Sequence, residues 1–334
     1  MASRNYPFNT VENSKRAERL RRRRRARSLI LSICAVVILL LLSLIILLIG
    51  SIAEHIGGLM PDRPDIPEET TTNAQSGTPV YVPVSWESKK VNSGALVLVN
   101  DNHYFDPATV GNLIKIKDNR TQINGQNPYM LNTSFAVWMQ KDAFNAMELM
   151  MQKYFEISEG DGSVMIKYSY RTLADQENLG SSVAAGHSDH HTGYCIALQD
   201  GNTENYPALN SGHWIYNNAY KFGFVQRYPD GKESYTGVSD YGHCFRYVGV
   251  SHATYMYTND LCLEEYVQLL KTSYATGNHL AISGADGNQY EVYYVPASDT
   301  ELTSINVPKD YSYTISGDND SGFIVTVNLS APNA

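Results

Sequence analysis

The longest apolar stretch of the chain lies near its N-terminus, where residues 28–53 carry no charged side chain. About 20 apolar residues are enough to cross a bilayer as a helix, so the pattern predicts a single membrane anchor over 29–53. A cleaved signal peptide is the alternative, although its apolar core of about 7 to 15 residues would be shorter than this stretch. The arginine run Arg21–Arg25 places the basic tail, 1–28, on the cytoplasmic side and the rest of the chain outside.

Apolar periodicity resumes after a polar spacer. Residues 54–93 are rich in proline and threonine and predict a linker. Helical spacing of apolar side chains predicts a helix over 134–155, on the core residues Phe144, Met147, Met151 and Tyr154. Further helices are expected over 211–223 and 261–276, and a strand over 163–168.

The C-terminal part, 273–334, changes to strand-length apolar runs. Residues 289–295 and 322–328 predict strands, and Asp286-Gly287 between apolar runs indicates a hairpin turn. The run Asp318–Gly322 resembles the start of a calcium loop, but it lacks the acidic residue at the far end, so a plain turn is favoured. We therefore expect a small β appendage.

Charge is divided unevenly along the chain. Residues 1–28 hold 10 Lys/Arg and 2 Asp/Glu, a net charge of +8, whereas the whole chain carries −8, which leaves −16 for the remainder. An acidic domain of this kind argues against nucleic acid as a partner. The arginine run is better explained by membrane topology than by nucleic-acid binding.

Two segments carry the pattern of a metallopeptidase site: Ser188-Asp-His-His-Thr-Gly-Tyr-Cys-Ile-Ala197 and Thr236-Gly-Val-Ser-Asp-Tyr-Gly-His-Cys-Phe-Arg-Tyr-Val-Gly249. They resemble the signature segments of the VanY-like D-alanyl-D-alanine carboxypeptidases, which are zinc peptidases of the Hedgehog/DD-peptidase fold. Leu96–Asn100 resembles the opening strand of that domain. The resemblance implies an α+β carboxypeptidase-like domain over 94–272.

In that family the first segment reads S-x-H-x-x-G-x-x-x-D and the second contains E-x-W-H, so that His, Asp and His bind zinc and Glu is the base. Placed on this pattern, His190 is retained as a ligand and Ser188 matches the family serine. The remaining positions differ from the family: Ala197 stands for Asp, Tyr241 for Glu, His243 for Trp and Cys244 for the last His.

These departures bear directly on chemistry. A catalytic zinc needs three protein ligands and an open position for water, and a carboxylate base then takes the proton. Ala197 cannot bind a metal, and Tyr241, with an ordinary pKa of about 10, is no substitute for a carboxylate base. We therefore expect neither bound zinc nor hydrolysis, although the resemblance implies zinc.

The cysteines admit three interpretations. Cys195 lies two residues before Ala197, so on a strand it faces the same side, and a disulfide between Cys195 and Cys244 would take the place of the metal in an oxidising compartment. Alternatively, His190 and Cys244, with His243, Cys195, His187 or His191, form a rebuilt zinc site. In the third, both thiols are buried and unpaired.

The resemblance also names substrate-binding residues. Tyr170-Arg171, followed by Gln176, matches the family stretch whose arginine lies in the substrate cleft, and Ser188 belongs to the same set. A guanidinium in that place would pair with the terminal carboxylate of a peptide. A structural salt bridge is the alternative for Arg171.

Three functions follow from these residues. The first is a membrane-anchored, extracytoplasmic pseudo-peptidase that binds the D-Ala-terminated stem peptides of peptidoglycan in cell-wall metabolism without cutting them. The second is an active zinc D,D-carboxypeptidase with a rebuilt metal site. The third is a structural ectodomain that binds a protein partner, in which the cleft is vestigial and filled by tyrosines.

Overall fold

A computed structural model describes residues 79–332, apart from 135, 203–207, 210, 211, 240 and 276. The predicted anchor, 29–53, and the first part of the predicted linker, 54–78, lie outside the described residues. None of the helices within the described range has the length and apolar character needed to span a membrane.

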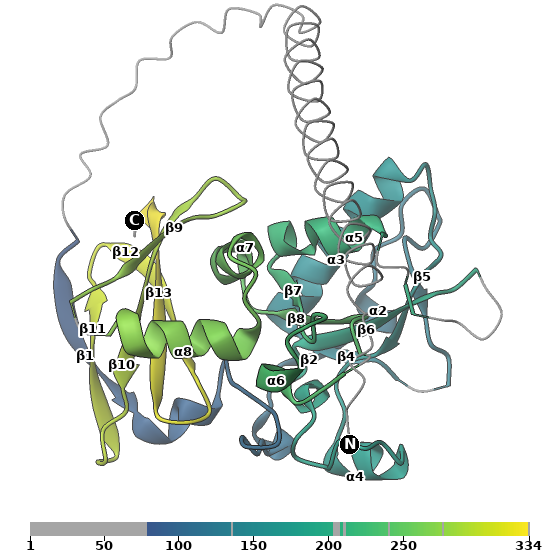
Figure 1. Ribbon diagram of the computed structural model, residues 1–334. Coiled ribbons are helices and arrows are strands. Elements are labelled where there is room, and N and C mark those ends of the chain that lie inside the picture. The colour runs from purple at the N-terminus through teal and green to yellow at the C-terminus, as the bar shows by residue number, and fades with distance from the viewer. Residues whose placement is uncertain are drawn as a thin grey trace, which may run out of the picture. The chain divides into compact units, whose positions relative to one another are not determined.

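A five-stranded sheet is formed by strands between residues 130 and 247 (Figure 1). Its strands pair in the order β3-β5-β6-β8-β7, antiparallel except for β3 and β5. Their bounds are Met130–Leu131 for β3, Val164–Tyr168 for β5, Cys195–Asp200 for β6, Cys244–Tyr247 for β8 and Phe224–Gln226 for β7. The strand predicted over 163–168 is therefore confirmed as β5.

One face of this sheet is covered by helix α3, Lys141–Ile157. The predicted apolar stripe is confirmed, because its side chains are buried against the sheet residues Ile166, Ile196, Leu198 and Phe245. The helix begins later than expected because β4, Trp138–Gln140, pairs with β2, Leu113–Lys115. Side chains alternate along a strand, so Cys195, Ala197 and Cys244 lie on the opposite face.

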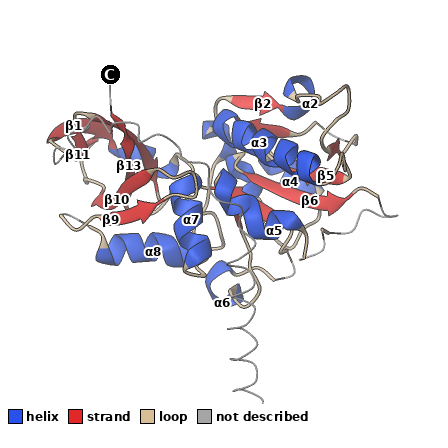
Figure 2. Ribbon diagram, turned by 90° about the horizontal axis from the view of Figure 1, so that it is seen from above, coloured by secondary structure: helices blue, strands red, loops and turns tan. Residues whose placement is uncertain are grey.

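Shorter helices connect these strands. They are α2 (Ile116–Asn119), α4 (Leu173–Asn178), α5 (Trp214–Asn218) and α6 (Glu233–Thr236), with 3₁₀ turns η2 (Pro107–Thr109), η3 (Asp189–Thr192) and η4 (Ala219–Phe222). The helix predicted over 211–223 is thus divided into α5 and η4. Helix α7, Val250–Thr258, lies between the five-stranded sheet and the C-terminal strands (Figure 2), and α8, Leu263–Ser273, follows it.

The C-terminal strands form a four-stranded sheet in the order β12-β13-β10-β9. Their bounds are Leu280–Ser283 for β9, Gln289–Pro296 for β10, Tyr311–Gly317 for β12 and Gly322–Pro332 for β13. The predicted turn at Asp286-Gly287 joins β9 to β10. The loop at Asp318 is a turn, because its carboxylate accepts the backbone N–H groups of residues 320, 321 and 322.

The predicted linker extends too far. Tyr81–Glu87 form strand β1, which pairs with β11, Leu302–Pro308, and Ser88–Asn92 form a 3₁₀ turn, η1. Proline at 83 is tolerated because β1 pairs on one side only. Val82, Val84 and Trp86 pack against the C-terminal core, so the chain is folded from about residue 80 onward.

The predicted opening strand is also wrong. Leu96–Val99 are buried but are not strand residues. Leu96 and Leu98 share a core cluster with α7, α8 and the C-terminal strands, and the backbone N–H of Leu98 donates to the carbonyl of Asp318. The C-terminal strands therefore share a core with the segment around Leu96 and Leu98.

Candidate functional site

Strands β6 and β8 bring three of the predicted site positions together. Ala197 lies directly opposite Cys244, and Cys195 lies one step along the same face. All three side chains are fully buried. Cys195 and Cys244 are joined in a disulfide, with their Cα atoms 6.7 Å apart and 49 residues of sequence separation. The two sulfurs lie under Tyr228 and Tyr241.

His190 is held over the same face by the turn η3. Its Nδ1 lies 2.8 Å from the carbonyl oxygen of Ser169, and since a carbonyl only accepts, Nδ1 carries the proton. The lone pair is therefore on Nε2, which lies 3.1 Å from the Tyr241 hydroxyl. Burial, together with the charge of Arg171, lowers the pKa of His190 well below its usual value, so the ring is neutral.

Tyr241 closes the space that a metal would need. Its hydroxyl donates to His190 Nε2, and its ring packs edge-on against His190 and His243. Burial raises the pKa of Tyr241 despite the opposing charge of Arg171. The hydroxyl is therefore a hydrogen-bond donor at neutral pH and does not act as a base.

The other histidines named from the sequence lie elsewhere. The metal-ligating atoms of His190, Cys195 and Cys244 are within 4.8 Å of one another, and His243 does not belong to this group. His187 Nδ1 donates to the carbonyl of Asn100. His191 uses both ring nitrogens, one accepting from the N–H of Gly186 and the other donating to the carbonyl of Arg171.

The donor set does not fit a catalytic zinc ion. In a disulfide neither sulfur is a thiolate, and the thiolate is the metal ligand. Ala197 offers no donor atom. The lone pair of His190 Nε2 already accepts a hydrogen bond from the Tyr241 hydroxyl. No described carboxylate belongs to this group of ligand atoms.

Arg171 is buried, and its guanidinium adds to the hydrogen bonds from Thr172 in lowering the pKa of Asp175. Its Nη1 donates to Gln176 Oε1 at 3.0 Å, and its guanidinium lies 4.3 Å from the ring centre of Tyr168. Nη2 is buried without a hydrogen-bond partner, and no described carboxylate forms an ion pair with the side chain. Gln176 is itself held by the carbonyl of Val183. Ser188 is buried just ahead of η3.

A cavity of about 470 Å³ opens beside Arg171. Much of its lining is aromatic or apolar, from Trp138, Tyr168, Tyr170 and Leu179. Polar groups come from Thr172, Asp175 and Asn178. Trp138 is 37 % exposed, so its ring is accessible to a ligand. Pockets that combine aromatic walls with a few placed polar groups are typical small-molecule and peptide sites.

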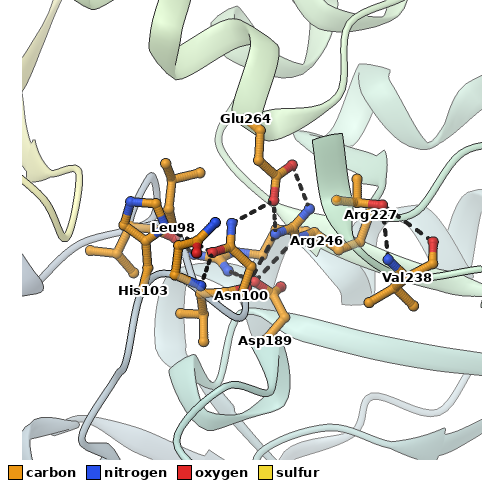
Figure 3. A network of polar contacts seen from close by, with 12 residues as sticks. Leu98, Asn100, His103, Asp189, Arg227, Val238, Arg246 and Glu264 are labelled. Atoms are coloured by element: carbon orange, nitrogen blue, oxygen red, sulfur yellow. Dashed lines mark hydrogen bonds and ion pairs between the residues drawn. The ribbon is translucent and has the colours of Figure 1, made fainter. Parts of the chain in front are cut away.

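A buried ion network, not foreseen from the sequence, holds η3 in place (Figure 3). Asp189 Oδ1 lies 2.6 Å from Arg246 Nη1 and 3.1 Å from Arg227 Nε. Arg227 also forms a bidentate pair with Glu264 of α8. Burial alone would raise the pKa of Asp189, but the two guanidiniums hold it below its usual value. The signal in the sequence was weak: Arg246 stands among the residues of β8, and Arg227 follows the apolar strand β7.

Comparisons with known proteins identify relatives of this chain. The family model described as VanY: D-alanyl-D-alanine carboxypeptidase matches residues 136–250. A D-alanyl-D-alanine carboxypeptidase from Enterococcus faecium is 30% identical over 246 residues, which cover 72% of this chain and 77% of the relative. A second, from Enterococcus faecalis, is 48% identical over 58 residues, 17% of this chain and 22% of the relative.

Among solved structures, the vancomycin resistance D,D-dipeptidase VanXYg, in complex with a D-Ala-D-Ala phosphinate analog, superposes with a TM-score of 0.63. It is 29% identical and covers 75% of this chain and 99% of its own.

Proposed function

This chain belongs to the VanY family of D-alanyl-D-alanine carboxypeptidases, and on that basis we propose that it is a pseudo-peptidase of cell-wall metabolism. It binds peptidoglycan stem peptides that end in D-alanine and does not cut them. Both parts of the proposal rest on the donor and charge arrangement around His190 and Arg171.

Loss of hydrolysis follows from the missing groups. Water activation at neutral pH needs a metal or a base, and Ala197 and Tyr241 stand where the family's metal-binding carboxylate and base would be. The disulfide removes the remaining ligand position, that of Cys244. Losing a general base alone costs about a hundredfold or more in rate.

Peptide binding is supported chiefly by the unpaired charge of Arg171. A buried cation is costly unless it is paired, yet among the described residues no carboxylate lies within ion-pair distance of this guanidinium, Asp175 acts on it only from farther away, and one nitrogen lacks a hydrogen bond. It lines a cavity large enough for a short peptide. A C-terminal carboxylate entering there would supply the missing charge through a charge-assisted hydrogen bond.

We also propose that this domain lies outside the cell and is tethered by the predicted span at 29–53. The disulfide supports an extracytoplasmic location, because such bonds persist in oxidising compartments and are rare in the cytosol. The arginine run before the span supports the same orientation.

The proposal is tested by calorimetric titration of the full chain, purified without reductant, with diacetyl-L-lysyl-D-alanyl-D-alanine. We expect binding, and no D-alanine release when zinc is added. The same peptide with a C-terminal amide should bind about tenfold or more weakly, since a hydrogen bond to a charged group contributes about 1.5–3 kcal/mol.

Arg171→Gln should weaken binding of the acid to the level of the amide. Lys153→Gln is the matched control, because it removes one exposed positive charge from α3. Release of D-alanine would instead identify an active carboxypeptidase. Failure of acid and amide alike to bind would favour a domain that recognises a protein partner.

A further inference from the structure

We propose that Cys195, Cys244 and His190 form a metal site in the reduced protein, for a soft divalent cation such as Zn²⁺. Two thiolates and one imidazole would be the ligands, a donor set without any carboxylate. The disulfide and the metal would then be alternative occupants of one place. This inference does not depend on peptide binding.

The geometry of the three donors supports this assignment. Their ligand atoms lie within 4.8 Å of one another and all three residues are buried. Zn–S and Zn–N bonds of about 2.3 and 2.0–2.1 Å place neighbouring tetrahedral ligands about 3.5 Å apart, so small side-chain rotations are sufficient. Because Cys195 and Cys244 sit on paired strands, the thiols stay close after the bond between them is broken.

His190 is oriented as metal-binding histidines usually are. Such a ring donates its other N–H to a carbonyl or carboxylate, which fixes the tautomer and directs the lone pair at the ion. His190 does this through Ser169. The group at its Nε2 is the hydroxyl of Tyr241, a residue that is only partly buried. Binding a metal would therefore displace this hydroxyl.

The change between the two states balances chemically. A dithiol reductant supplies two electrons and two protons, the Cys195–Cys244 bond breaks to give two thiols, and the reductant becomes a disulfide. Metal binding then releases the two thiol protons to solvent. Without a carboxylate base in the group, the bound metal would stabilise the fold and would not restore hydrolysis.

The test is a cobalt(II) titration of the full chain, before and after reduction with a dithiol and its removal without oxygen. A Cys34→Ser, Cys262→Ser background restricts the signal to the site thiols. We expect the reduced protein to bind one Co²⁺ per chain with a thiolate-to-cobalt charge-transfer band, and the oxidised protein to show none. Zinc should displace the cobalt and remain bound through desalting.

Single variants assign the ligands. Cys195→Ser and Cys244→Ser should each halve the charge-transfer band, and His190→Gln should keep the band but weaken metal affinity about tenfold or more, in the range seen when metal-site groups are lost. Far-ultraviolet circular dichroism checks that each variant is folded. Absence of the band in the folded, reduced protein, or an equal band in the oxidised protein, would overturn the assignment. Peptide binding is measured on the oxidised protein, so the two proposals fail independently.

Discussion

At the scale of single residues, the proposed function depends on a few side chains, two on paired strands and one in the loop before β8. Ala197 and Cys244 face each other across β6 and β8, and Tyr241 lies against His190. The strands and the turn thus bring together the positions at which the family resemblance places the metal ligands and the base. If these positions account for the proposed loss of activity, substitution should restore it.

We predict that Ala197→Asp, Tyr241→Glu and Cys244→His, combined with Cys195→Ala, will give a protein that binds zinc and releases D-alanine. The two ligand changes restore a carboxylate and an imidazole beside His190, and the third restores a base. Zinc content and D-alanine release are the measurements. The variant that retains Tyr241 should also bind zinc. It should release D-alanine at least about a hundredfold more slowly, because it lacks the base. A folded, zinc-loaded quadruple variant without activity would contradict the explanation.

Reduction of the disulfide should lower stability substantially. In the chain-entropy model, a loop of about 50 residues contributes roughly 4 kcal/mol to the free energy of unfolding. Urea denaturation of oxidised and reduced protein, both with chelator present, measures the difference. Adding zinc to the reduced protein should recover part of the loss. Equal stability in both redox states would show that the bond has no such role.

At the scale of elements, buried ion pairs join a turn, two strand segments and a helix. Asp189 on η3 is shared by Arg246 of β8 and Arg227, just after β7, and Arg227 continues to Glu264 on α8. Arg246 also donates to the carbonyls of Ala95 and Val97. The turn that carries His190 is thereby fixed to segments distant in sequence.

Asp189→Ala should therefore destabilise the protein by about 3–5 kcal/mol, the usual cost of leaving buried charges without their partner. Glu156→Gln is the control, since it breaks only an exposed ion pair with Lys153 and should cost no more than about 0.5 kcal/mol. Denaturant melts at pH 7 measure both. A small effect of Asp189→Ala would mean that the network is dispensable.

The elements that were predicted correctly are those with a strong local pattern. Helix α3 shows helical spacing over several turns, and β5, β10 and β13 are apolar runs bounded by turn residues. Strand β1 was missed because Pro83 argues against a strand locally, whereas pairing with β11 and packing against the C-terminal core stabilise it. The strand predicted over Leu96–Val99 was wrong for the opposite reason. These residues are apolar because they are buried in a core, and they do not pair as a strand.

The site residues also divide into those predictable from local sequence and those that depend on the fold. The common facing of Cys195 and Ala197 follows from strand alternation alone, whereas the disulfide needed β8 to lie beside β6. The unpaired charge of Arg171 and the contact of Tyr241 with His190 depend on segments brought together only by the fold. Neither has a signature in local sequence.

At the scale of the whole molecule, His252 links α7 to the C-terminal strands. Its ring nitrogens lie 2.7 Å from the hydroxyl of Tyr266 and 2.8 Å from that of Thr326. Burial lowers the pKa of His252 to about 3. The folded protein therefore holds this ring neutral at pH values where the unfolded chain protonates it.

Stability should consequently fall with acidification. Below the unfolded pKa of about 6.5 and down to about 3, each pH unit removes roughly 1.4 kcal/mol through this residue, and the loss stops below the folded pKa. Denaturant melts between pH 6 and 4.8 avoid most carboxylate titration. His252→Gln should reduce the slope of the free energy of unfolding against pH by the amount that corresponds to about one bound proton. An unchanged slope would mean that His252 does not control it.

The hydrogen bond between Tyr241 and His190 has a consequence for inhibitors. Tetrahedral phosphinates gain affinity in metallopeptidases because they imitate the transition state and coordinate the metal. We expect a site closed by the Tyr241 phenol to lack this preference, because His190 Nε2 already accepts the hydroxyl. On the proposed function, phosphinate and parent peptide should compete about equally for this protein, so a metal-directed inhibitor would lose the advantage over the intact peptide that it has in a zinc peptidase.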